Sequence, residues 1–209
     1  MKEVAKQIIR AAARVLVSPL YFCFLLQQII SDRRRAFQGY SQALSLLPGR
    51  PGEYLRREFY RLTLVHCAPS VIISFGTVFS TDKIALEDNV YIGAYCILGT
   101  CRIGQNTMVS SRVSVVSGLR QHGTERLDVP MREQAGTFSE VEIGEDCWLG
   151  EGAIVGASVG SQSVVAAGSV VVQSVEPRSV VGGNPAKLLK QRGAISALGD
   201  GCETTVRRT

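Results

Sequence analysis

The chain of 209 residues has only two histidines, one tryptophan and no pair of cysteines spaced as CxxC. The lack of paired cysteines argues against a zinc or redox site, and the cysteines are expected to be reduced thiols in a cytosolic setting. The net charge of +5 comes without a nucleic-acid recognition motif or a stacking set of aromatic residues, so no nucleic-acid partner is expected. Basic residues concentrate at the two ends of the chain, which favours an anionic lipid surface and a phosphorylated cofactor as partners.

A six-residue period dominates the second half of the chain. Each block opens with a branched apolar residue and carries a small or branched residue four places on; the openers are Ile143, Leu149, Val159, Val165 and Val171. This period matches neither an α-helix at 3.6 residues nor an isolated strand at two. It is typical of a coiled parallel β-helix, in which each block forms one short strand.

The same period occurs earlier in the chain, with openers at Leu86, Ile92, Ile103, Val109 and Val115. Two blocks are irregular, at Leu98–Arg102 and Val155–Ser158, and local bulges are expected there. Glycines that follow three openers, Gly144, Gly150 and Gly160, are expected at corners where the backbone needs a positive φ. The period stops at residues 117–140, and a long loop inside a compact solenoid is usually functional.

Four motifs accompany the repeats: SGLRQH (117–122), IGEDCWLG (143–150), VAAGSVV (165–171) and GGNPAK (182–187). Together they resemble the hexapeptide-repeat acyltransferases, and in particular the sugar O-acetyltransferases, over roughly residues 71–190. The resemblance implies a left-handed parallel β-helix, a homotrimer, and acetyl-CoA as acyl donor in a groove between subunits. It implies direct acyl transfer and no metal.

Acyl transfer to an alcohol needs a general base, and histidine is the side chain that titrates near neutral pH. His122 lies in the interrupting loop, where the resembled family carries its base, so His122 is the candidate catalytic residue. Glu125, Asp128, a backbone carbonyl or a residue of a neighbouring subunit are the open candidates for orienting its ring. His66 is expected on a connecting helix in a structural role.

The resemblance assigns pantetheine contacts to Gly150 and Ala167, and it places Lys187 and Lys190 near the adenosine phosphates. Trp148 is expected to pack at a corner or to line the groove. Many relatives carry a Thr-Lys pair where this chain has Val172–Gln173. The missing phosphate contact is expected from Lys187, Lys190 or Arg192, if it is made at all.

Residues 1–35 indicate a membrane-associating helical segment. Lys2, Lys6, Arg10 and Arg14 repeat at a spacing of four, and an uncharged apolar run, Val15–Ile30, ends before Asp32 and a triple arginine. Basic flanks on both sides favour the cytoplasmic side for both, which places the protein on the cytoplasmic face of the inner or plasma membrane. The favoured form is a hairpin broken at Pro19 or an interfacial helix; a single span and a helix packed on the protein's own core remain alternatives.

Residues 36–70 are expected to form connecting helices, with Pro51 in the first turn of one of them. Arg56, Arg57 and Arg61 are expected on a solvated face or at lipid headgroups. The tail, 191–209, is expected to hold a short helix and a frayed end.

The leading hypothesis is an O-acetyltransferase that acts on a sugar hydroxyl of a surface polysaccharide or its lipid-linked precursor. The first alternative is N-acetylation of a nucleotide-linked amino sugar, which needs the same base but no membrane. The second is a purely structural or metal-bearing β-helix, and two histidines are too few for a three-histidine zinc site.

Overall fold

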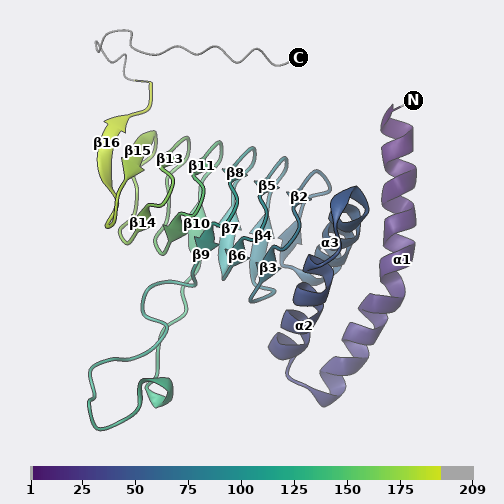
Figure 1. The fold of residues 1–209 in the computed structure, drawn as a ribbon. Coiled ribbons are helices and arrows are strands. Elements are labelled where there is room, and N and C mark those ends of the chain that lie inside the picture. The colour runs from purple at the N-terminus through teal and green to yellow at the C-terminus, as the bar shows by residue number, and fades with distance from the viewer. Residues whose placement is uncertain (1, 194–209) are drawn as a thin grey trace.

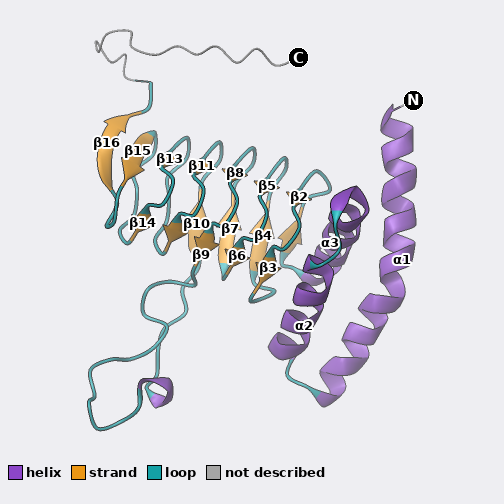
Figure 2. Ribbon diagram, viewed as in Figure 1, coloured by secondary structure: helices purple, strands orange, loops and turns teal. Residues whose placement is uncertain are grey.

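The computed structural model describes residues 2–193 and shows a helical hairpin region followed by one long coil of strands (Figure 1). Helix α1 (Lys2–Ile30) precedes α2 (Arg33–Ser45) and α3 (Gly49–Thr63). These three helices lie together at the end of the coil where its first strands begin (Figures 1 and 2).

The coil consists of three parallel sheets that the chain visits in turn. The first sheet contains β1 (His66–Cys67), β4 (Ile84–Leu86), β7 (Cys101–Ile103) and β10 (Val141–Ile143). The second contains β2 (Ile72–Ile73), β5 (Tyr91–Ile92), β8 (Met108–Val109), β11 (Trp148–Leu149), β13 (Val164–Val165), β15 (Ser179–Gly182) and the antiparallel β16 (Lys187–Gln191). The third contains β3 (Val78–Phe79), β6 (Ile97–Leu98), β9 (Ser114–Val115), β12 (Ile154–Val155) and β14 (Val170–Val171).

The predicted β-helix is therefore confirmed, and its core follows the six-residue period. Block openers stack in register along each sheet, as Val109, Leu149 and Val165 do in the second sheet. Each is buried, with an exposed fraction of 0%. One buried branched side chain per strand gives every coil an apolar interior that only the neighbouring coils can cover.

The small inward residues also carry the polar bonds between coils. The Thr107 hydroxyl donates to the Gly144 carbonyl at 2.7 Å and accepts from the Cys147 backbone N–H at 3.0 Å. Cys96 and Cys147 fill equivalent positions and are buried, as the period predicts. The five cysteines of the described region carry free thiols.

The glycines that follow the openers serve a purpose other than the predicted one. Gly144, Gly150 and Gly160 do not adopt a positive φ; among the described corners that conformation is taken by residues such as Asn89, Asn106 and Gln162. A Cβ on Gly144 would lie 2.5 Å from the Ser161 nitrogen of the next coil. Glycine is needed at these positions because successive turns approach too closely for a side chain.

The irregular block Val155–Ser158 is absorbed without breaking the coil. Val159 makes only isolated bridges, to Ile143 and Val175, where the earlier coils have a strand of the first sheet. Its side chain nevertheless stays buried, with an exposed fraction of 2%. The shortened block therefore removes one strand from the first sheet, and the apolar core remains continuous.

Helix α1 is continuous from Lys2 to Ile30, so the hairpin broken at Pro19 is not formed. Pro19 has no N–H to donate within the helix, and the neighbouring Ser18 hydroxyl bonds the Arg14 carbonyl at 2.8 Å. Val17 and Phe24, on either side of the proline, are buried. Packing on both sides holds the helix through the proline, and the hairpin is made between α1 and α2 instead.

Only one side of α1 is covered. Ala13, Val17 and Phe24 are buried, whereas a longer set of apolar side chains is exposed, including Val15, Leu16, Phe22, Ile29 and Ile30. Among the described helices, α1 has the length and apolar composition to cross a bilayer, over Gln7–Ile30.

The connecting region differs from its prediction in three places. The coil begins at β1, ahead of Val71, and His66 lies on that strand and not on a helix. Arg56 is fully buried, where its guanidinium donates to the carbonyls of Ile73, Leu44 and Leu47. Arg57 is also buried, so neither side chain lies on a solvated face.

Candidate active site

An open cleft of about 430 Å³ lies where the second sheet turns toward the third. Its lining includes Tyr91 and Trp148, the corner residues Ser110, Gly150 and Ala167, and the carboxylate of Glu151. The six-residue period produces this surface, because strand residues that alternate with the buried openers point outward. The cleft brings together two residues that the sequence assigned to the cofactor, Gly150 and Ala167.

Gly150 and Ala167 occupy equivalent corners of successive coils. A Cβ on Gly150 would lie 2.4 Å from the Ala167 nitrogen, so the two backbones touch. The Gly150 N–H is already bonded to the Val165 carbonyl at 2.7 Å. Within the described residues, the Ala167 N–H and carbonyl make no backbone hydrogen bond, and Ala167 is exposed. Ala167 therefore offers the cleft one donor and one acceptor.

Trp148 lines this cleft and does not pack into the interior. Half of its surface, 51%, is exposed, and its indole N–H donates to the Ser110 hydroxyl at 3.0 Å. This bond links two successive coils and fixes the ring across the second sheet. Ser110 and Tyr91 were missed by sequence reasoning, because only the stacking of coils shows that they share a surface with Trp148.

His122 lies on the loop 117–140, which leaves the coil after β9 and returns at β10 (Figure 1). The two arms of the loop pair near the coil: the Ser139 N–H donates to the Ser117 carbonyl at 3.1 Å, and the Thr137 N–H donates to the Arg120 carbonyl at 2.6 Å. A Cβ on Gly136 would lie 2.0 Å from the Gln121 carbonyl oxygen. The backbone at His122 is thus held against the opposite arm, while the residue itself is exposed.

The two carboxylates proposed to orient His122 have other partners. Asp128 is bonded to the Arg126 guanidinium, which lowers the pKa of that carboxyl group. The Glu125 carboxylate accepts from the Thr124 N–H at 3.0 Å. Within the described loop, neither is hydrogen-bonded to His122.

The loop and the cleft lie at different corners of the coil. The loop connects the third sheet to the first, whereas Gly150 and Ala167 lie between the second sheet and the third. The structure of one chain therefore does not bring His122 to Gly150 and Ala167.

The C-terminal cations are distributed along β16. Lys187 pairs with Gly182, one coil beyond Ala166, but it lines a separate cleft of about 330 Å³ at the end of the coil. Lys190 is exposed opposite Val180, toward the other end of the strand. Arg192 is occupied, because it bonds the Asp146 and Gln162 carbonyls at 3.0 Å each. The short helix expected in the tail falls outside the described residues.

In the described part of the chain, no group of three His, Cys, Asp or Glu side chains is placed to hold a metal ion. His66, the other histidine, lies 3.6 Å from Glu87 on the first sheet. It is remote in the fold from both the cleft and the loop.

A family model described as the hexapeptide repeat of succinyl-transferase matches residues 140–173, which include Trp148, Gly150 and Ala167. The matched segment, residues 140–173, is thus a stretch of hexapeptide repeats.

Curated relatives match the coil over about half of the chain. One is WbbJ of Escherichia coli, provisionally named a lipopolysaccharide biosynthesis O-acetyl transferase, which is 31% identical over 125 residues, or 56% of this chain and 61% of the relative. Another is a chloramphenicol acetyltransferase of Agrobacterium fabrum, 30% identical over 50% of this chain and 53% of the relative. The chain thus spans less than two thirds of the length of these relatives.

Solved structures extend the likeness to most of the fold of this chain. A maltose O-acetyltransferase from Clostridium difficile superposes with a TM-score of 0.65 at 20% identity, covering 78% of this chain and 89% of its own. An acetyltransferase from Vibrio cholerae, solved with acetyl coenzyme A, gives 0.62 at 23% identity, covering 76% and 86%. At such identities the likeness establishes the shared fold.

Proposed function

We propose that the protein is an acetyl-CoA-dependent O-acetyltransferase that acts on a sugar hydroxyl of a surface polysaccharide or its lipid-linked precursor. The observation that carries the proposal is the corner cleft at Trp148, Gly150 and Ala167. Its lining combines the rings of Tyr91 and Trp148 with small corner residues and one carboxylate, Glu151, which is paired with Arg112. The free N–H and carbonyl of Ala167 match the amides of a pantetheine arm. The Vibrio cholerae structure of the same fold was solved with acetyl coenzyme A.

In the proposed reaction His122 accepts the proton of the sugar hydroxyl, and the oxygen attacks the thioester carbonyl. Formation of the carbon–oxygen bond gives a tetrahedral intermediate. Collapse of this intermediate breaks the carbon–sulfur bond and releases the thiolate of coenzyme A. The proton on the imidazole then passes to that thiolate. No acyl-enzyme is formed, so none of the buried cysteines is needed as a nucleophile.

The reaction needs His122 and the cleft side by side, and we infer a homotrimer from this requirement. One chain holds the two features at different corners of its coil. Threefold packing of such coils would lay the loop of one chain on the cleft of its neighbour. Lys187 and Lys190 remain the proposed phosphate contacts at the end of that groove. Both lie on β16, the last strand of the second sheet.

Membrane attachment through α1 would bring a lipid-linked acceptor to this site. The exposed apolar side chains of α1 and the basic residues at both of its ends favour the cytoplasmic face of the inner or plasma membrane. Attachment raises the effective concentration of an acceptor in the same bilayer.

The test of the proposed mechanism is His122→Ala, with His66→Ala as the matched control. Lipid-linked saccharides are incubated with acetyl-CoA and enzyme, and transfer is followed by mass spectrometry. Loss of a general base is expected to lower kcat by about a hundred- to ten-thousandfold, while the His66 variant keeps the wild-type rate. A His122 variant within a few-fold of wild type would overturn the mechanism, and transfer only to free nucleotide-linked amino sugars would favour N-acetylation.

A further inference from the structure

Helices α1 and α3 pack on one another, and residues of both line two adjoining clefts. The first, of about 340 Å³, is lined by Arg10, Arg50, Glu53 and Arg57 of the helices, by Ser70 of the first coil and by Asn89 of the second coil. The second, of about 330 Å³, is apolar and is lined by Ile9, Ala12, Ala13, Leu16, Pro51 and Leu55. Arg50 and Tyr54 line both clefts, so a basic chamber opens directly onto an apolar groove.

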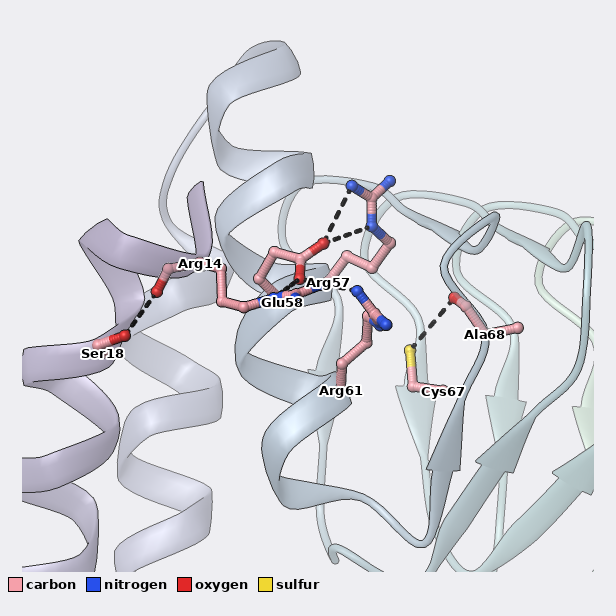
Figure 3. A network of polar contacts seen from close by, with 7 residues as sticks. All are labelled: Arg14, Ser18, Arg57, Glu58, Arg61, Cys67 and Ala68. Carbon is pink, nitrogen blue, oxygen red and sulfur yellow. Dashed lines mark hydrogen bonds and ion pairs between the residues drawn. The ribbon is translucent and has the colours of Figure 1, made fainter. Parts of the chain in front are cut away.

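The basic chamber has more positive charge than its own carboxylates balance. Glu58, which is 1% exposed, is shared among Arg14, Arg57 and Arg61 at 3.0 to 3.3 Å (Figure 3). Glu53 lies 3.9 Å from Arg50. Burial lowers the pKa of Arg57, and the charge of Arg10 lowers it further, against the opposing effect of Glu58. An added anion would relieve this repulsion.

Arg10 contributes its side chain to the lining of this chamber, together with Arg50 and Arg57. A phosphate oxygen is a strong acceptor for a guanidinium. Arg57 is fixed: its guanidinium lies 4.7 Å from the centre of the Tyr54 ring and bonds Glu58.

The apolar groove continues onto the exposed side of α1. Leu16 is 70% exposed, and Val15, Phe22 and Ile29 extend the apolar surface toward the end of the helix. Arg10 lies in the N-terminal third of α1, and exposed apolar side chains extend from Ile9 along the rest of the helix. This arrangement complements a molecule with a phosphate at one end and a hydrocarbon chain at the other.

We propose that the space between α1 and α3 is a binding site for a single anionic phospholipid, with its phosphate held by Arg10, Arg50 and Arg57 and an acyl chain in the groove at Ala12 and Leu16. The site would fix the orientation of the helical region on the membrane. The proposal rests on the proposed contact of α1 with a bilayer, and it is independent of acetyl transfer.

The test uses the full chain and calorimetric titration with short-chain phosphatidic acid below its micelle concentration. Inorganic phosphate and short-chain phosphatidylcholine are titrated in parallel. Phosphatidic acid is expected to bind at least about tenfold more tightly than inorganic phosphate, which cannot use the groove. Equal affinity for the two would overturn the lipid assignment and indicate a simple phosphate site. If phosphatidylcholine bound as tightly as phosphatidic acid, the proposal of a site for an anionic lipid would be overturned.

Two site variants and one control locate the site, and none of them changes a residue of the proposed active site. Arg10→Gln combined with Arg50→Gln is expected to weaken phosphatidic acid binding by about tenfold or more. Ala12→Phe, an exposed position, is expected to fill the groove and to weaken lipid binding without changing the weak binding of inorganic phosphate. Arg35→Gln, at an exposed arginine of α2, is the matched control and should bind like wild type. Wild-type binding by the double variant, or an equal loss in the Arg35 variant, would overturn the proposal; thermal unfolding of each variant checks its folding.

Discussion

At the scale of single residues, the chain shows how one pattern can have a physical reason different from the one it suggests. The glycines after the block openers were expected to supply a positive φ, and they instead leave room for the next coil, because a Cβ on Gly150 would overlap the Ala167 nitrogen. Arg56 could not be placed from the sequence, because its carbonyl partners Leu44, Leu47 and Ile73 come from separate elements. A side chain whose bonds are made across the fold leaves no local signal.

The free backbone groups of Ala167 lead to a prediction on cofactor binding. Ala167→Phe places a ring in the cleft beside the free N–H and carbonyl of residue 167. Coenzyme A binding is expected to weaken by about tenfold or more, because the ligand has to displace this ring. Gln105→Phe, at an exposed corner that lines neither this cleft nor the one at Lys187, is the control. Calorimetric titration with coenzyme A measures both, and unchanged affinity in the Ala167 variant would remove the cleft from the cofactor site.

The cysteines lead to a second residue-scale prediction. Burial raises the pKa of Cys67 and Cys101 to about 12, so almost no thiolate is present at pH 8, while Cys23 is exposed. Iodoacetamide should therefore label Cys23 rapidly in the folded protein and should leave Cys67 and Cys101 unlabelled until urea is added. Peptide mass spectrometry reads each site, and rapid labelling of Cys101 in the folded state would contradict its place in the core.

At the scale of elements, periodicity made the coil predictable, whereas the helices depended on contacts that periodicity does not report. Each opener repeats the same inward position, so Leu149 and its neighbours in the stack could be assigned to the core from spacing alone. Pro19 was expected to break α1, but the burial of Val17 and Phe24 against the other helices maintains the helix through it. Tertiary packing outweighs a single lost hydrogen bond.

The stacked core leads to a stability prediction. Leu149→Ala removes a fully buried side chain between two coils and is expected to lower the free energy of unfolding by about 2–5 kcal/mol. Ile97→Ala, at an outward position of β6 that is 55% exposed, should cost less than about 1 kcal/mol. Urea denaturation compares the two. Equal losses would mean that the inward and outward faces have been assigned wrongly.

At the scale of the whole molecule, the two halves of the proposed site were predictable separately and their relation was not. The motifs identified His122 and the pair Gly150 and Ala167, and the coil brings the pair into one cleft. The sequence does not report at which corner the loop leaves the coil. The structure places that corner away from the cleft, and the central claim is that two chains complete one active site.

Co-expression of His122→Ala with Ala167→Phe tests this claim most directly, because each variant lacks a different half of the proposed site. Random assembly should give about a quarter of the interfaces an intact loop facing an intact cleft. At acetyl-CoA concentrations well below the wild-type KM, acetyl transfer to lipid-linked saccharide should then recover to about a quarter of the wild-type rate. Alone, the Ala167→Phe variant should give about a tenth of that rate or less, and the His122→Ala variant about a hundredth or less. A mixture as inactive as its components would contradict the account.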